Sequence, residues 1–336
     1  MSHTDLDFKN ILVLNFGQLG DVILSLPALS AIREKFPTAK ITVMGGKAVA
    51  QIVTLSGFSD DQIIVDRVKL RDSAKLWSIR QILKLIGETR TKKFDFVIDL
   101  HSLSETNLLG FISGAKKRLY GNRKSRSLDL LGNFQPKPPQ EDKHKHLTDR
   151  YLDILKPLGI ENSKRFVQIL PQEKEIEEVK QLFKKLEIGE KTLVGLFLGA
   201  GHPSRRWDLD NFVRLAKELS KDETLQLLVF LGPEEADLRE EVRAKFPPNI
   251  IIIDNLTLLQ FFAALSFLRV LISNDTGPMH LGAIAGAAVV LILDKRAPTT
   301  YLPLTNKLEI VTGAEIDKIS VAEVFQATDR ILKNET

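Results

Sequence analysis

The residues best suited to chemistry occur in two loops, each of which follows a strand-like apolar run. The first loop is Gly17-Gln18-Leu19-Gly20-Asp21, after the run 11–16. Its glycines allow a tight turn and the close approach of a substrate, and the Asp21 carboxylate could accept a proton from an attacking hydroxyl group. A structural interpretation stays open, because aspartate is also common at helix N-termini, where it caps the first turn.

The second loop, Asp275-Thr276-Gly277-Pro278, follows the apolar run 269–272 and precedes a helix of small residues. Threonine and glycine before proline are typical of a helix N-terminus. Such a terminus directs backbone N–H groups and the positive end of the helix dipole at a bound anion, commonly phosphate. His280, one turn inside the helix, could donate to that phosphate or make a buried polar contact. The loop therefore predicts a diphosphate-binding site.

Two further loops of the second half could add to such a site. Gly199–Trp207 offers glycine N–H groups, the Ser204 hydroxyl and two arginines that can grip phosphate in bidentate fashion. Gly232-Pro233-Glu234-Glu235 places an acid where it could bind ribose hydroxyls or simply complement a helix dipole. No Gly-Lys-Ser/Thr follows the first of these loops, and Gly17-x-x-Gly20 lacks the first glycine of the dinucleotide fingerprint. The sequence therefore argues against an ATPase and an NAD-dependent dehydrogenase.

Composition limits the class of protein further. A chain of 336 residues predicts two domains, and the absence of cysteine excludes disulfides, thiolate metal sites and a cysteine nucleophile. No His/Asp/Glu cluster has metal-ligand spacing, so we expect no protein-held metal. The polar N-terminus shows no signal peptide, and no apolar run reaches the ~18 residues of a membrane span. We expect a soluble, cytoplasmic protein that is at most peripheral to a membrane.

A basic stretch lies between Gly114 and Arg126. It could meet an anionic ligand, lipid headgroups or nucleic acid, or it could be an ordinary solvated surface. Nucleic acid is the least favoured partner, because Tyr120 is the only tyrosine in the stretch and aromatic residues are not interleaved with the charges. The stretch contains no acid, and its basic residues are Lys116, Lys117, Arg118, Arg123, Lys124 and Arg126.

Apolar runs alternate with helical segments in both halves of the chain, which predicts a doubly wound α/β fold. We expect a boundary near Pro171, a first domain over 1–170, a second over 171–317, and a C-terminal helix within 318–336 that packs back on the first domain. Ligands of such sheets bind beyond the carboxyl ends of the strands. The expected strands cover 10–16, 40–45, 63–68, 94–100, 193–198, 225–231, 250–253, 270–272 and 289–293.

These motifs, in this order, resemble the ADP-heptose:lipopolysaccharide heptosyltransferases, which are inverting glycosyltransferases of the GT-B fold. The resemblance covers nearly the whole chain and implies two Rossmann-like domains facing across a cleft. It rests on Gly20-Asp21 with Leu26-Pro27-Ala28-Leu29 and Arg33, on Arg205-Arg206-Trp207, on Gly232-Pro233-Glu234-Glu235, and on Asp275-Thr276-Gly277-Pro278-Met279-His280.

The resemblance implies that Asp21 is the general base in transfer of heptose from ADP-heptose to an anionic lipopolysaccharide core acceptor, without a metal or cofactor. The second domain would bind the nucleotide sugar, and the first would bind the lipid-linked acceptor, at most peripherally to the inner membrane. Donor contacts then fall on Ala200, Gly201, Ser204, Arg205, Glu235, Asp275, Thr276, Gly277 and His280. Acceptor contacts fall on Gly20, His101, Arg123, Lys124 and Arg126.

The sequence leaves four points open. The family often has lysine where this chain has Arg205, and either Glu234 or Glu235 could bind the ribose. A nucleotide-sugar epimerase of the same architecture would also bind a sugar diphosphate between two α/β halves. A non-catalytic protein that binds nucleotide sugars is the other alternative, against which an intact Asp21 argues.

Overall fold

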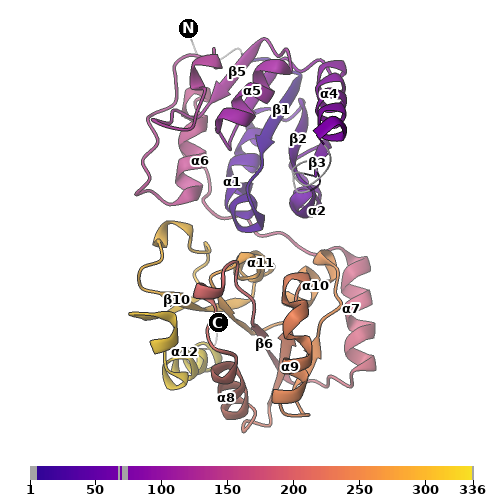
Figure 1. Cartoon of the computed structure of the whole chain (residues 1–336), viewed down its shortest axis with the longest axis vertical. Coiled ribbons are helices and arrows are strands. Elements are labelled where there is room, and N and C mark those ends of the chain that lie inside the picture. The colour runs from indigo at the N-terminus through magenta and orange to yellow at the C-terminus, as the bar shows by residue number, and fades with distance from the viewer. Residues whose placement is uncertain (1–5, 67–68, 70–74, 335–336) are drawn as a thin grey trace. The chain divides into compact units, whose positions relative to one another are not determined.

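The computed structural model describes residues 6–66, 69 and 75–334, and the chain divides into two compact units (Figure 1). The first unit comprises the chain up to Val167 together with the returning segment Thr300–Leu302. The second comprises Gln168–Thr299 and the chain from Pro303 onward. The main division therefore falls close to the boundary that the sequence places near Pro171, but the return of three residues to the first unit is a feature that the sequence did not reveal.

The first unit is built on a parallel five-stranded sheet of order β3-β2-β1-β4-β5. Its strands are β1 (Asn10–Asn15), β2 (Lys40–Gly46), β3 (Asp61–Val65), β4 (Phe96–Asp99) and β5 (Lys117–Tyr120). Its helices are α1 (Leu19–Lys35), α2 (Lys47–Ser56), α4 (Lys75–Thr91), α5 (Ser104–Ile112) and α6 (Leu147–Leu155), with short 3-10 turns η1 (Asp129–Leu131) and η2 (Lys156–Leu158). The predicted strand 63–68 in fact ends at Val65, and residues 67–68 lie outside the described part of the chain.

The second unit is built on a parallel six-stranded sheet of order β11-β10-β9-β6-β7-β8. Its strands are β6 (Thr192–Phe197), β7 (Leu225–Phe230), β8 (Ile251–Ile253), β9 (Val270–Asn274), β10 (Ala288–Asp294) and β11 (Leu308–Gly313). Its α-helices are α7 (Glu173–Lys185), α8 (Leu209–Leu219), α9 (Arg239–Lys245), α10 (Leu258–Leu265), α11 (Gly277–Ala285) and α12 (Val321–Lys333). Its 3-10 turns are η3 (Pro203–Arg205), η4 (Pro233–Leu238) and η6 (Ile316–Lys318), and η5 (Thr299–Tyr301) crosses into the first unit.

Both sheets have the same doubly wound topology. In each unit the first strand lies at the centre, the next two strands extend the sheet on one side, and the fourth strand starts the other side. The central strands are fully apolar because helices cover both faces of a parallel sheet, and Ile11–Leu14 in β1 are completely buried. The α/β prediction is therefore confirmed. The strand order reverses between β1 and β4 and between β6 and β9, the points where such folds bind ligands.

Helix α1 carries the loop after β1 into the core of the first unit. It continues through Pro27 as one helix and buries its apolar residues between Val22 and Ile32. Helix α6 packs beside it, and the Thr148 hydroxyl donates to the Leu24 carbonyl at 2.8 Å. This bond fixes α6, and the charged residues that it carries, next to the start of α1.

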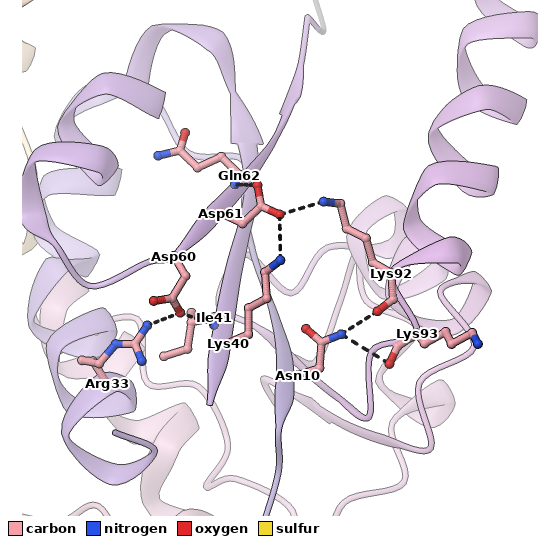
Figure 2. Close-up of polar contacts among 9 residues, drawn as sticks. All are labelled: Asn10, Arg33, Lys40, Ile41, Asp60, Asp61, Gln62, Lys92 and Lys93. Atoms are coloured by element: carbon pink, nitrogen blue, oxygen red, sulfur yellow. Dashed lines mark hydrogen bonds and ion pairs between the residues drawn. The ribbon is translucent and has the colours of Figure 1, made fainter. Parts of the chain in front are cut away.

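Ion pairs at the amino ends of β1, β2 and β3 stabilise the edge of the first sheet that lies opposite the loops (Figure 2). Asp61 pairs with Lys92 at 2.7 Å and with Lys40 at 3.6 Å. Asp60 pairs with Arg33 and accepts a hydrogen bond from the Ile41 N–H at 2.7 Å. Arg33, one of the residues that carry the family resemblance, thus has a structural contact at the amino end of the sheet.

The C-terminal helix differs from its prediction. Helix α12 packs against α8 and β11 in the second unit, where Val324 and Ala327 are completely buried in the hydrophobic core. The indole N–H of Trp207 also donates to the Ile319 carbonyl, just before this helix, at 2.9 Å. The apolar face of α12 therefore completes the core of the second unit, whereas the sequence predicts that it packs back on the first.

Candidate functional site

The candidate residues form two sets, one at the switch point of each sheet. In the first unit, the loop before Asp21 follows β1 and His101 follows β4, the strand beside β1. In the second, the loop 198–207 follows β6, and Asp275 follows β9, the strand beside β6. Each sheet thus brings together loops that are far apart in the sequence.

A buried amide fixes the loop after β1. Asn15 ends the strand with only 2% of its surface exposed, and its Oδ1 accepts a hydrogen bond from the Gly17 N–H at 3.0 Å. Its Nδ2 donates to the Ser25 hydroxyl at 2.7 Å, and that hydroxyl donates to the Val22 carbonyl at 2.7 Å. Because these buried polar groups satisfy one another, the loop has a defined path between β1 and α1.

Asp21 lies in the first turn of α1, two residues after its start at Leu19. The helix N-cap is Gln18, whose backbone N–H donates to Asp21 Oδ2 at 3.1 Å. The helix thus begins two residues before Asp21, and the capping contact that the sequence leaves open for this residue is present. A Cβ on Gly17 would lie 2.5 Å from the Asp21 Cβ, which explains the glycine at that position.

The surroundings of Asp21 make its carboxylate more basic. Burial raises the pKa of Asp21, while the Gln18 N–H and the charge of Arg150 oppose that shift. Burial also raises the pKa of Tyr151, and the negative charge of Asp21 raises it further. Arg150 and Tyr151 both come from α6, so this helix supplies the electrostatic surroundings of Asp21. The sequence did not identify either residue, because nothing near them in the chain marks a site.

Two arginines share one glutamate near this carboxylate. Glu141 Oε1 lies 3.2 Å from an Arg123 guanidinium nitrogen and 3.3 Å from Arg150 Nε. These three side chains are mostly buried, and all three line one pocket of the first unit. The Arg150 guanidinium also lies 5.7 Å from the ring centroid of Tyr301, in the returning segment. Arg123 therefore has an acidic partner from outside the basic stretch.

Asp99 holds the loop that carries His101. Its completely buried carboxylate accepts hydrogen bonds from the Ser102 N–H at 2.7 Å and from the Asn107 amide at 2.8 Å. Burial raises the pKa of Asp99 to about 6, although these hydrogen bonds oppose the shift. The His101 ring lies edge-on to Phe16, with 6.4 Å between ring centroids, so the loops after β1 and β4 are in contact.

Lys124 and Arg126, the remaining acceptor candidates with Gly20, lie in an exposed loop beside α5. The Arg126 carbonyl accepts a hydrogen bond from the Ser104 N–H, the first residue of α5, at 3.0 Å. Gly20 is half-buried in the first turn of α1. The acceptor candidates therefore occupy loops at the carboxyl ends of β1, β4 and β5 and do not form one compact cluster.

In the second unit, the side-chain amide of Asn274 fixes the neighbouring loops, as that of Asn15 does in the first unit. This completely buried residue ends β9, and its Nδ2 donates to the Leu198 and Gly199 carbonyls at 3.0 and 3.1 Å. Its Oδ1 accepts a hydrogen bond from the Trp207 N–H at 3.0 Å. A single side chain thus ties the loop after β6, including the predicted contacts Ala200 and Gly201, to the loop after β9.

Glu235 turns inward beside this loop, whereas Glu234 is exposed. The Glu235 carboxylate caps η4 by accepting the Gly232 N–H at 2.9 Å. A Cβ on Gly199 would lie 1.9 Å from Glu235 Oε1, so the glycine leaves the space that this carboxylate occupies. Burial raises the pKa of Glu235. Of the two acids left open by the sequence, Glu235 is the one that faces the loop after β6.

Arg205 and Asp275 join the two loops on their exposed side. Their side chains approach to 3.3 Å, with 53% of the arginine and 20% of the aspartate exposed. Burial raises the pKa of Asp275, and the Arg205 charge opposes that shift. An exposed pair of this kind contributes little to stability, so the guanidinium can turn to an anionic ligand at small cost. Ser204 pairs with the His202 ring at 2.8 Å in the same turn.

Helix α11 begins at Gly277 with Thr276 as its N-cap. The Thr276 side chain makes no capping hydrogen bond, in contrast to the hydroxyl cap that the sequence predicts. His280 is buried inside the first turns, with 5% of its surface exposed. The helix N-terminus therefore presents its backbone N–H groups and dipole beside the Arg205–Asp275 pair, as an anion site requires.

Two doubly wound sheets in one chain, each with candidate loops at its switch point, are the architecture of the GT-B glycosyltransferases. The model of glycosyltransferase family 9 (heptosyltransferase) matches residues 82–326. The chain belongs to this family and is a glycosyltransferase.

Individual relatives agree with this family. The lipooligosaccharide heptosyltransferase 2 of Campylobacter jejuni is 26% identical over 301 residues, which cover 86% of this chain and 82% of the relative. A family 9 glycosyltransferase from Veillonella parvula superposes with a TM-score of 0.86 at 24% identity, over 98% of each chain. The ADP-heptose lipopolysaccharide heptosyltransferase II of Escherichia coli gives a TM-score of 0.78 at 18% identity, over 96% of this chain and 98% of that one.

The described residues, 6–66, 69 and 75–334, include neither a metal-binding cluster nor a helix that could span a membrane. They contain no group of three or more His, Cys, Asp or Glu side chains arranged to hold a metal ion. Among their helices, none has both the length and the apolar character needed to cross a membrane.

The buried Asp99 predicts an unusual pH dependence of stability. Because its folded-state pKa of about 6 exceeds the ordinary 3.8, the folded protein holds this proton more tightly than the unfolded chain. Between about pH 4 and 6, the free energy of unfolding of the wild type should therefore fall with rising pH relative to Asp99→Asn. The expected difference is on the order of 2–3 kcal/mol by urea denaturation.

Asp61→Asn is the matched control. The pKa of Asp61 is lowered by its hydrogen bond from Lys92. The wild type should therefore gain stability relative to this variant only as the pH rises to about 3.8, and the difference should stay nearly constant between about pH 4 and 6. Two variants with the same slope would contradict a buried, protonatable Asp99.

Proposed function

We propose that this glycosyltransferase transfers a heptose from ADP-heptose to an anionic, lipid-linked lipopolysaccharide core, with inversion at the anomeric carbon and without a metal. The observation that carries the proposal is the chemistry at the two switch points. One presents a half-buried carboxylate of raised pKa, and the other presents an arginine beside a helix N-terminus. The names of the relatives support the heptose, the ADP and the lipopolysaccharide.

Asp21 acts as the general base. A sugar hydroxyl is a poor nucleophile, so its proton moves to the Asp21 carboxylate as the acceptor oxygen bonds to the anomeric carbon. Asp21 Oδ2 is held by the Gln18 N–H, and the carboxylate has a second oxygen with which to take the proton. Burial raises its pKa and strengthens it as a base, while the charge of Arg150 keeps it ionised.

The second unit stabilises the leaving group. As the bond between the anomeric carbon and the diphosphate breaks, its electron pair goes to the ADP oxygen. Arg205 and the N–H groups at the start of α11 face this charge, and a single preorganised donor of this kind contributes roughly 3 kcal/mol in a known enzyme. Gly201 and Ala200 approach the diphosphate through their backbone, Glu235 binds the ribose hydroxyls, and Ser204, Asp275 and His280 complete the donor site.

The acceptor binds to the first unit. Its carboxylates and phosphates meet Arg123, Lys124 and Arg126, while Gly20 and His101 contact the sugar near Asp21. The mostly buried Arg123–Glu141–Arg150 group carries one more positive charge than negative charge, which suits an anionic core. We place the enzyme in the cytoplasm, in peripheral contact with the inner membrane that holds such an acceptor.

Membership of a glycosyltransferase family removes the two alternative classes. An epimerase would isomerise the donor sugar, and a sensor would bind it without turnover. Transfer of a labelled heptose to a core acceptor distinguishes this proposal from both, because the label then leaves the nucleotide and joins the acceptor.

Asp21→Asn and Asp21→Ala separate catalysis from helix capping. Both variants should lose at least ~100-fold in transfer rate, because neither side chain can accept the proton. The asparagine oxygen can still accept the Gln18 N–H, so only the alanine variant should also lose about 0.5–2 kcal/mol of stability. Transfer kinetics and urea denaturation are measured on the same preparations. A near-normal rate in Asp21→Asn would reduce Asp21 to a capping residue.

Arg205→Ala should weaken the binding of ADP at least ~10-fold, because the variant loses a charged phosphate contact and leaves Asp275 unpaired. Isothermal titration calorimetry with ADP alone measures this effect. Arg330→Ala is the matched control, since Arg330 is 56% exposed and pairs with Glu309 at 2.8 Å in the same unit. Equal ADP affinity in the two variants would exclude Arg205 from the donor site.

Removal of divalent metal should leave the transfer rate unchanged, because Arg205 and the α11 N-terminus carry the leaving-group charge in this mechanism. The rate is compared in EDTA and in added Mg²⁺ or Mn²⁺, with a chelated metal-dependent enzyme as the control. Strict dependence on added metal would contradict the metal-free leaving-group model and leave the assignment of Asp21 untouched.

A further inference from the structure

An apolar stripe lies exposed on the outer side of the first unit. Leu108 and Phe111 are one turn apart on α5 and are 44% and 47% exposed, and Leu130 in η1 is 74% exposed. Their neighbours Leu109 and Leu131 pack inward against the core. The inward set already anchors these elements, so the outward set has no role in the core of the described structure.

Arg118 joins the parts of this stripe. Its guanidinium lies 5.2 Å from the centroid of the Phe111 ring, and its Nε donates to the Leu131 carbonyl at 2.9 Å. A further hydrogen bond to the Ala115 carbonyl, at 2.6 Å, fixes the same side chain. The exposed Phe111 ring on α5 and the exposed Leu130 of η1 therefore lie on one continuous surface. The Arg118 guanidinium is part of that surface.

Positive charge lies at both ends of α5. Exposed Lys116 and Lys117 follow the C-terminal end. At the other end, the Arg126 carbonyl is bonded to the Ser104 N–H, which brings exposed Lys124 and Arg126 beside the start of the helix. The apolar stripe thus has a pair of exposed cations at each end.

The net positive charge of the protein is concentrated in the region around this stripe. Residues 101–140 contain seven lysines and arginines against two acids, Glu105 and Asp129, a net charge of +5. The whole chain has a net charge of +4, so the other residues together carry −1. Asp129 is itself paired with Lys137 at 3.2 Å. A surface with this charge pattern favours an anionic partner.

We propose that this face, formed by α5, β5 and η1 and named here the α5 face, docks on the surface of an anionic phospholipid bilayer. Leu108, Phe111 and Leu130 enter the headgroup region, and Lys116 and Lys117 contact lipid phosphates, while Lys124 and Arg126 at the other end of α5 remain available to the acceptor. A small group of apolar side chains between clusters of lysine and arginine is typical of a surface that binds at the membrane interface. The core of a protein–protein interface, in contrast, is depleted of charged residues.

The inference adds a membrane-binding surface to the proposed function. It rests on that function only for the purpose of membrane binding, which is to bring the enzyme to a lipid-linked acceptor. Binding to vesicles requires neither donor nor acceptor. The two proposals can therefore fail separately, because vesicle binding tests the α5 face and transfer to a delipidated acceptor tests the catalytic site.

Vesicle co-sedimentation of the full chain is the first test, with pure phosphatidylcholine compared with a mixture containing phosphatidylglycerol. We expect binding to the anionic vesicles that weakens with salt. Leu108→Ser with Phe111→Ser should reduce the partition coefficient at least ~10-fold, and Lys116→Ala with Lys117→Ala should reduce it about 5-fold per charge. Ile310→Ser, at an exposed apolar residue of β11 in the second unit, is the matched control.

A fluorescent label gives a second readout that does not depend on stability. Since the chain contains no cysteine, Phe111→Cys and Ile310→Cys each provide a unique site for an environment-sensitive dye. The dye at position 111 should shift to the blue with anionic vesicles, and the dye at position 310 should not. Absence of vesicle binding by the wild type, equal shifts at both positions, or unchanged binding of the Leu108/Phe111 variant would each overturn the proposal. Unchanged transfer to a delipidated acceptor by that variant would show that its active site is intact.

Discussion

A buried polar group at the end of a central strand has to find hydrogen-bond partners without water, and this constraint shapes both sites. Asn15 ends β1 and Asn274 ends β9, and each amide satisfies both its donor and its acceptor with neighbouring loop groups. An unsatisfied amide would cost about 1–3 kcal/mol. The loops that follow the strands therefore have defined paths, and these paths hold the candidate residues near the carboxyl ends of the central strands.

The two carboxylates proposed to act in the reaction and in donor binding also have structural partners. Asp21 caps the start of α1 and Glu235 caps η4 through a backbone N–H in each case. Each of these hydrogen bonds fixes the side chain in one orientation and opposes the rise in pKa that burial causes. Structural and catalytic interpretations of a carboxylate at a helix start are therefore compatible, and only a substitution that keeps the cap can distinguish them.

Sequence patterns were sufficient to predict the strands that are buried on both faces of a sheet. Such strands are continuous apolar runs, so the central strands of both sheets and the loops after them were predicted. Strands β5 and β11 were not, because they contain charged residues such as Lys117 and Glu309 and lie at the edges of their sheets. The sequence also does not predict which unit α12 packs against, because the pattern of an amphipathic helix shows which of its faces is buried but not what covers that face.

The partners of the site residues were the least predictable feature. Arg123 lies in a stretch without acids, yet Glu141 from outside that stretch pairs with it and with Arg150. Arg150 and Tyr151, which surround Asp21, belong to a helix with no motif of its own. These contacts depend on the packing of α6 against α1, a tertiary relation that local sequence periodicity does not encode. The sequence thus predicts which strands the candidate loops follow, but it does not predict the electrostatic environment of their side chains.

The returning segment Thr300–Leu302 has a consequence for how the polypeptide can be divided. His146 Nε2 is 2.9 Å from the Leu302 carbonyl oxygen, and the Arg150 guanidinium lies over the Tyr301 ring. Cutting the chain after Val167 would leave this short segment on one fragment and both of its partners on the other. The first fragment would then lack three residues of its unit, so the architecture is discontinuous along the chain although each sheet is formed from consecutive strands.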